Sequence, residues 1–161
     1  MGIMKTLYIL RHAQKDESNP DQYDYDVELT LKGKEDSKKI GKKLKEKNIC
    51  PDLIVSSPAI RARTTAEIVA NEIEYPRSVM YNETIYQAFL NEIIESITYT
   101  YDTVDTLMVV GHNPSLTALA ISFTGYKEEL KMANAIRIDF DCSSWTSIDK
   151  SNAQFIELIE I

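Results

Sequence analysis

The sequence predicts a three-layer α/β/α domain with a mostly parallel central sheet. Short apolar runs alternate along the chain with longer segments of helical periodicity, and such runs are typical of strands buried on both faces. Three of the runs, residues 6–10, 53–55 and 106–110, each precede a predicted helix, which favours parallel strands joined by helical crossovers. Because no repeat or linker divides the chain, we expect residues 1–161 to form a single domain.

The N-terminal third is expected to contain one strand and one helix. Residues 6–10 (TLYIL) form the strand, and the polar residues 15–28 form a loop over the sheet edge. Thr30 is a suitable N-cap for a lysine-rich helix that ends near Lys47. The inward face of this helix is expected to carry Leu31, Ile40 and Leu44.

Two more helices are expected in the middle of the chain. The strand at residues 53–55 leads into a helix over residues 59–72, and Pro58 suits the first helical position. A further helix is expected over residues 85–99. The inward positions of the two helices are Ala62, Ala66, Val69 and Ile73 in the first, and Ile85, Phe89, Ile93 and Ile97 in the second.

The last third begins with the strand at residues 106–110 (TLMVV). Asn113-Pro114 opens a helix that is expected to end near Phe123. Residues 135–141 and 154–160 alternate or run apolar, which predicts two further strands.

The composition is that of an ordinary globular protein, with 43% hydrophobic and 27% charged residues. A formal net charge of −7 argues against a nucleic-acid-binding or membrane-binding surface. Cys50 and Cys142 lack the spacing of a metal or redox motif, and the first apolar run is too short for a signal peptide or a membrane span. We therefore expect a cytoplasmic protein.

Basic side chains follow all three strands that are predicted to be parallel. Arg11 and His12 end the first strand, Arg61 and Arg63 lie in the helix turn after the second, and His112 follows the third. Ligands of open α/β sheets bind at the carboxyl ends of the strands, so these side chains are expected to gather there.

Arginines in the first turn of a helix need an explanation. This turn carries a positive partial charge and ordinarily favours Asp or Glu. A bound phosphoryl group would remove the conflict, whereas a surface carboxylate or solvent would suffice for an exposed side chain. We assign Arg61 to the phosphate site and Arg63 to the surface.

A metal site is the main alternative for the two histidines. Neither has a Cys or carboxylate at ligand spacing, and the arginine beside His12 would repel a divalent cation. Arg11 instead suits an anion, and its charge favours the neutral form of His12, which leaves a ring nitrogen free for nucleophilic attack. We expect no metal and no organic cofactor.

Four sequence blocks resemble those of the histidine phosphatase superfamily, in the same order. Residues 7–13 (LYILRHA) contain its Arg-His-Ala hallmark, and Leu29-Thr30 followed by Gly33 is similar to the next block. Residues 56–67 (SSPAIRARTTAE) resemble the second-arginine block, and residues 110–114 (VGHNP) the second-histidine block. The resemblance extends to about residue 119 and implies a phosphoglycerate mutase-like fold.

The short chain resembles most the SixA branch, the small phosphohistidine phosphatases. That branch commonly has Arg-Pro-Leu before its first long helix, whereas this chain has Val27 at the arginine position, and Lys15 is a candidate replacement for the missing basic contact. Asn113, in the second-histidine block, is a candidate phosphate contact. Larger members use a carboxylic acid as proton donor, and Glu83 lies in the comparable region.

The resemblance implies a two-step phosphoryl transfer. His12 attacks phosphorus and forms a phosphohistidine, which water hydrolyses, while Arg11, Arg61 and a protonated His112 contact the phosphoryl oxygens. Bound phosphate would raise the pKa of His112 and so favour that charge. Phosphate or sulfate is also expected to bind this site.

The implied substrate is phosphohistidine on a signalling protein such as a histidine phosphotransfer domain. An imidazole leaving group, whose conjugate acid has a pKa of about 6.5, needs little help from a proton donor. The alternatives are a small-molecule phosphomonoesterase or mutase-like relative, which a carboxylic acid at Glu83 close to His12 would favour, and a non-catalytic module that binds a phosphorylated ligand.

Overall fold

A six-stranded mixed sheet forms the centre of the protein. The computed structural model describes residues 4–161; residues 1–3 of the predicted domain lie outside this range. The strand order is β3-β2-β4-β1-β5-β6; β1 to β4 run parallel, and β5 pairs antiparallel with both β1 and β6. The strands are β1 (Lys5–Arg11), β2 (Leu53–Ser56), β3 (Met80–Tyr81), β4 (Thr106–Gly111), β5 (Ala135–Phe140) and β6 (Ala153–Ile159).

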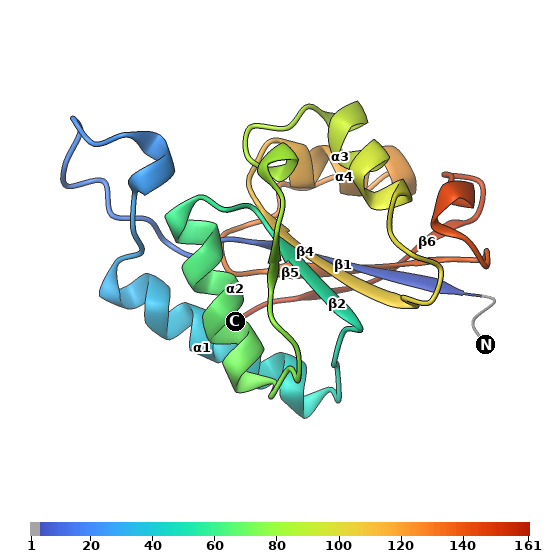
Figure 1. Ribbon diagram of the computed structural model, residues 1–161, viewed down its shortest axis with the longest axis horizontal. Helices are drawn as coiled ribbons and strands as arrows, with labels where there is room; N and C mark the ends of the chain where they lie inside the picture. Colours follow the sequence, from blue (N-terminus) through green and yellow to red (C-terminus); the bar gives the residue numbers. More distant parts are fainter. Residues whose placement is uncertain (1–3) are drawn as a thin grey trace.

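Helices cover both faces of the sheet, which gives three layers. Figure 1 shows α1 and α2 on one side of the strands and α3 and α4 on the other. The helices are α1 (Leu31–Glu46), α2 (Ile60–Glu72), α3 (Leu90–Thr98) and α4 (Ser115–Thr124), with 3-10 turns η1 (Asp24–Asp26), η2 (Glu83–Ile85) and η3 (Trp145–Ser147). This arrangement confirms the predicted α/β/α class. No helix within residues 4–161 has the length and apolar character needed to cross a membrane.

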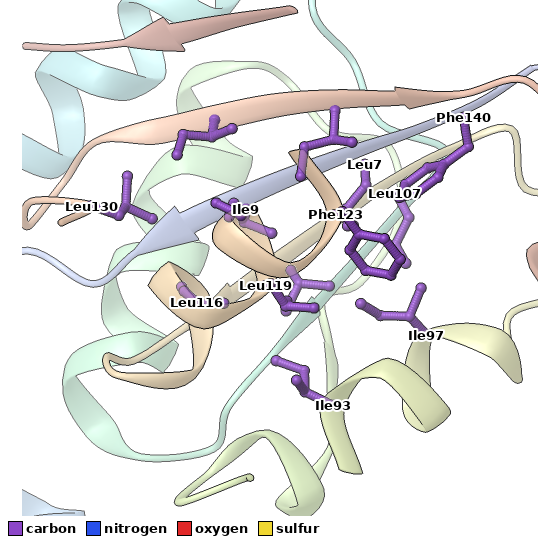
Figure 2. Packing of buried hydrophobic residues seen from close by; sticks show 14 of the residues in the cluster. Leu7, Ile9, Ile93, Ile97, Leu107, Leu116, Leu119, Phe123, Leu130 and Phe140 are labelled. Carbon is purple, nitrogen blue, oxygen red and sulfur yellow. The ribbon is translucent and has the colours of Figure 1, made fainter. Parts of the chain in front are cut away.

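The side chains of β1 alternate between two hydrophobic clusters. Leu7 and Ile9 pack in the cluster beneath α3 and α4, and Figure 2 shows them beside Leu119 and Phe123 of α4. Residues Tyr8 and Leu10 point the other way, into the cluster beneath α1 and α2. Because both faces of this strand are covered, its sequence is a continuous apolar run rather than an alternating one.

The inward faces of the first two helices are confirmed with one exception. Ile40 and Leu44 of α1 are buried, as are the four inward positions predicted for the second helix, the last of which, Ile73, is the C-cap of α2. Leu31, in contrast, is 80% exposed. It lies nine residues before Ile40, and at about 100° per residue this spacing places the two side chains on opposite sides of the helix.

Three other local predictions are wrong. Pro58 is not the first helical residue, because α2 begins after Ala59 as its N-cap. The third helix begins at Leu90 rather than near residue 85, because η2 and a left-handed residue at Gln87 (φ 57°) interrupt it. Phe89 is therefore the N-cap, with extended backbone, and is 76% exposed. The two-residue strand β3 was not predicted, since it is too short to show a periodicity.

The N-terminus of α1 packs directly against the backbone that follows His12. Thr30 caps the helix by accepting a hydrogen bond from the Gly33 amide (2.9 Å), as predicted. A Cβ at Gly33 would lie 2.3 Å from the Gln14 carbonyl oxygen, which no side chain tolerates without movement of the backbone. Only glycine permits this close approach.

Gly33→Ala is therefore expected to destabilise the protein by about 1–3 kcal/mol, the usual cost of overpacking a tight contact. Urea unfolding of the purified variant would measure this change. The neighbouring exposed Lys34→Ala serves as the control and is expected to stay within about 0.5 kcal/mol of wild type. Equal unfolding midpoints for the two variants would contradict the argument.

Candidate active site

The two histidines follow neighbouring parallel strands at the same sheet edge. Arg11 at the end of β1 is in register with Gly111 at the end of β4, and the His12 amide donates to the Gly111 carbonyl (3.1 Å). The imidazole rings of His12 and His112 therefore lie close together, with centroids 5.2 Å apart. The structure thus brings together residues that are a hundred positions apart in the chain.

His12 is held in a defined orientation. Its ring is buried, and Nδ1 lies 2.7 Å from the Ala13 carbonyl oxygen, a contact in which the nitrogen is the donor. Burial lowers the pKa of His12 to about 4; the Ala13 hydrogen bond opposes this, and the charges of Arg61 and Arg11 add to it. At neutral pH the ring is uncharged, and with the hydrogen on Nδ1 the lone pair is on Nε2.

The two arginines differ in their partners. Arg61 is buried and donates from Nη1 to the Asp24 carbonyl (2.6 Å) and from Nη2 to the Asp24 carboxylate (2.9 Å). Arg11 donates from Nη1 to the Leu130 carbonyl (3.2 Å), and the same Nη1 lies 3.8 Å from the carboxylate oxygen Oε1 of Glu129. Each guanidinium group is therefore held in place by a loop residue, Asp24 for Arg61 and Leu130 for Arg11.

Arg63 lies on the surface, as predicted from the sequence. Its Nε is 3.3 Å from the Glu67 carboxylate one helical turn away, and both side chains are half exposed. The guanidinium also stacks 4.5 Å above the Tyr81 ring. These contacts account for its charge without a ligand.

His112 is buried and uncharged in the ligand-free protein. Its Nε2 lies 2.8 Å from the Ser57 hydroxyl, which can donate to it and leave the hydrogen on Nδ1. Burial lowers the pKa of His112 to about 3, and the charge of Arg61 lowers it further. The protonated state of His112 that is expected from the sequence therefore requires a bound dianion to raise this pKa.

Three buried nitrogen atoms in this cluster lack a hydrogen-bond partner. They are Nε of Arg11, Nε of Arg61 and Nδ1 of His112, and within residues 4–161 no other buried side-chain nitrogen or oxygen is without one. An unsatisfied buried donor costs about 1–3 kcal/mol. An oxyanion that accepts hydrogen bonds from such donors would remove this cost, so the cluster is suited to bind a phosphoryl group.

The other residues singled out from the sequence lie around this cluster. The positive charge of Lys15 lowers the pKa of both His12 and His112, so Lys15 acts on the site electrostatically. Val27 is buried and supplies no basic contact. Glu83, in η2, is exposed and accepts a hydrogen bond from the Tyr25 hydroxyl (3.3 Å).

Asn113 has a structural role. Its Nδ2 donates to the Leu130 carbonyl (2.9 Å), and its Oδ1 accepts from the amide and hydroxyl of Thr117 (3.2 and 2.8 Å). The amide thus anchors the start of α4 to the loop that also holds Arg11. These contacts engage both ends of the side chain, so they do not support the predicted phosphate contact.

Three residues at the site were not found by sequence reasoning. Ser57 supports His112, and Tyr86 donates a hydrogen bond to the Asp24 carboxylate (2.9 Å) while its ring packs edge-on against His112 (5.8 Å). Ser57 lies within the second-arginine block, but its residue type alone indicates no role. Asp24 and Tyr86 lie in irregular segments, where periodicity carries no signal. No three His, Cys, Asp or Glu side chains of residues 4–161 gather as a metal site.

Known proteins are similar to this chain in sequence and in fold. The sequence profile described as Histidine phosphatase superfamily (branch 1) matches residues 7–84. An uncharacterised Mycobacterium tuberculosis protein is 35% identical over 113 residues, which are 70% of this chain and 68% of the relative.

Two solved structures show the same fold over almost the whole chain. The SixA protein of Agrobacterium tumefaciens has a TM-score of 0.84 at 22% identity, with 98% of each chain covered. The protein histidine phosphatase SixA in complex with tungstate has a TM-score of 0.81 at 18% identity, with 96% of each chain covered. The profile match and the sequence relative show that the chain belongs to the histidine phosphatase superfamily, branch 1.

Proposed function

We propose that this protein is a metal-independent phosphatase in which His12 is the nucleophile and a phosphohistidine is the covalent intermediate. The observation that carries this proposal is the state of His12. Its Nδ1 donates to the Ala13 carbonyl, and burial keeps the ring neutral, so that Nε2 has a free lone pair among positively charged neighbours. A neutral imidazole oriented by its second nitrogen is an activated nucleophile.

The reaction has two in-line displacements. First, Nε2 of His12 forms a bond to phosphorus while the bond from phosphorus to the leaving group breaks, and the leaving group takes up a proton from water. A second water molecule then attacks the phosphohistidine and releases a proton to the solvent, the bond between phosphorus and Nε2 breaks, and inorganic phosphate leaves. Arg11, Arg61 and His112 donate to the equatorial oxygens, where charge collects in the transition state.

We propose phosphohistidine on a protein, such as a histidine phosphotransfer domain, as the substrate. The carboxylate nearest the arginines, Asp24, is unsuited to donate a proton. Burial raises its pKa, but the hydrogen bonds from Arg61 and Tyr86 outweigh this effect and hold the pKa below its usual range. Glu83, the predicted proton donor, is exposed and accepts a hydrogen bond from the Tyr25 hydroxyl (3.3 Å). A site with these two carboxylates suits a leaving group that departs without a well-placed proton donor, as imidazole does. The structural likeness to SixA proteins supports the same substrate class.

A comparison of three substrates tests the proposal. The purified protein would be incubated with a phosphohistidine-containing protein, a phosphoserine peptide and an aryl phosphate, and release of phosphate would be measured. We expect the highest kcat/KM with phosphohistidine. Faster turnover of the esters would favour a phosphomonoesterase, and no turnover of any of them would favour a non-catalytic binding module.

Both histidine rings are expected to remain neutral at pH values well below the usual histidine pKa of about 6.5. Because the chain contains only His12 and His112, their imidazole resonances are readily assigned by NMR. With pKa values lowered to about 4 and about 3, neither ring should titrate between pH 8 and about pH 5.5. In urea both rings should titrate near pH 6.5. A ring in the folded protein with a midpoint near 6.5 would contradict the proposed state of that histidine.

A further inference from the structure

The Arg61 guanidinium already has an anionic partner within the protein. Asp24 contacts it twice, through its backbone carbonyl at Nη1 (2.6 Å) and its carboxylate at Nη2 (2.9 Å). The side chain of Arg61 is 6% exposed and that of Asp24 is 48% exposed. A buried charge is thus neutralised by a group that borders on solvent.

Specific contacts hold Asp24 in this position. Its carboxylate accepts a second hydrogen bond, from the Tyr86 hydroxyl (2.9 Å). The loop between β1 and α1, which extends beyond the carboxyl end of β1 in Figure 1, carries Asp24 on the 3-10 turn η1. Residues 16–28 of this loop contain six acidic and no basic residues, so the carboxylates of the loop repel one another and oppose its close packing.

The Asp24 carboxylate and a bound phosphoryl group would both accept hydrogen bonds from the Arg61 guanidinium. In the proposed function Arg61 donates to phosphoryl oxygens, yet both of its Nη atoms are engaged by Asp24 in the ligand-free protein. A carboxylate and a dianionic phosphoryl group repel each other at such short range. A phosphoryl group can still reach the unpaired Nε and the second hydrogen on each Nη atom. It then meets the Asp24 carboxylate at short range, so its binding carries the cost of this repulsion or of moving the carboxylate away.

We propose that Asp24 competes internally with the phosphoryl group for Arg61 and thereby weakens the retention of free phosphate. This inference rests on the proposed function. Inorganic phosphate makes only the phosphoryl contacts, so the cost of displacing Asp24 falls on these contacts alone. A phosphorylated protein meets the same cost, and contacts outside its phosphoryl group would offset it. Because Asp24 weakens the phosphoryl contacts of every ligand, it lowers the affinity for the product phosphate and so promotes product release.

The test compares anion binding by wild type and Asp24→Asn. Asparagine preserves the size of the side chain and the backbone contact to Arg61 but removes the competing charge. Asp26→Asn, which removes one charge from the same turn, is the matched control. Binding of tungstate and of inorganic phosphate would be measured by calorimetry, together with product inhibition by phosphate.

We expect Asp24→Asn to bind both anions about tenfold more tightly and to be inhibited by phosphate at correspondingly lower concentrations, with less than a twofold change in Asp26→Asn. Tyr86→Phe, which removes one of the two hydrogen bonds to the carboxylate, should give a smaller gain in affinity. The Tyr86→Phe measurement also provides a test if Asp24→Asn does not fold.

Different results separate this inference from the proposed function. If wild type binds tungstate and Asp24→Asn binds it equally or more weakly, Asp24 is not a competitor, and the proposed function still stands. A fall in kcat with unchanged anion affinity would instead identify Asp24 as a group that acts in the reaction. If neither wild type nor Asp24→Asn binds tungstate or phosphate, the anion site itself and the proposed function are overturned.

Discussion

Replacement of His12 by alanine is expected to lower kcat for phosphohistidine hydrolysis by at least about 10⁴-fold, because the covalent route then has no nucleophile. The loss should appear in kcat more than in KM, since Arg11, Arg61 and His112 still bind the phosphoryl group. Steady-state phosphate release would measure both constants.

Trapping of the intermediate complements the kinetic measurement. Wild type quenched without acid during turnover should carry one phosphoryl group on the peptide that contains His12, and the variant should carry none. Residual turnover above about 1% of wild type in His12→Ala, with no labelled peptide in wild type, would overturn the assignment of the nucleophile.

Replacement of Arg61 by methionine is expected to lower kcat/KM by about 10²–10³-fold, since the removed guanidinium would stabilise transition-state charge. Stability should change little. The variant loses two hydrogen bonds to Asp24, but it also removes a buried charge from the positive end of α2 and a buried Nε without a partner. Asp24, half exposed, regains water. Calorimetry should therefore find a Tm within about 4 °C of wild type.

Arg63→Met is the matched control for this change. It removes the same charge from the same helix two residues later, at a position paired only with Glu67 and Tyr81. We expect its kcat/KM to remain within about twofold of wild type. Equal losses in the two variants would mean that the general charge of the helix start matters, rather than the position of Arg61.

Much of the fold could be predicted from short-range pattern. The strands β1, β2, β4, β5 and β6 are buried apolar or alternating runs, and α1 begins where Thr30 predicts its cap. The failures at Leu31 and Phe89 have a geometric cause, since burial depends on where a helix begins and how it is rotated toward the sheet. An apolar residue at the end of a helix fits the helical periodicity whether its side chain faces the sheet or the solvent.

The centre of the site could be predicted for a different reason. Arg11 ends β1, His12 and His112 directly follow β1 and β4, and the carboxyl ends of parallel strands meet at one edge. The group that partners Arg61 could not be predicted in this way. The contacts of Asp24 to Arg61 and to Tyr86 span 37 and 62 residues, and no spacing in the sequence encodes such a meeting.

The register of β1 with β4 has a consequence for how such a protein can diversify. The spacing between the two imidazoles depends on backbone hydrogen bonds between adjacent central strands, with Arg11 opposite Gly111. The long stretch of chain between these strands can therefore gain or lose residues in its surface loops without moving either histidine. The reacting groups and the segments that surround them are thus separable: insertions at the rim would alter which molecules reach the site while the chemistry stays the same.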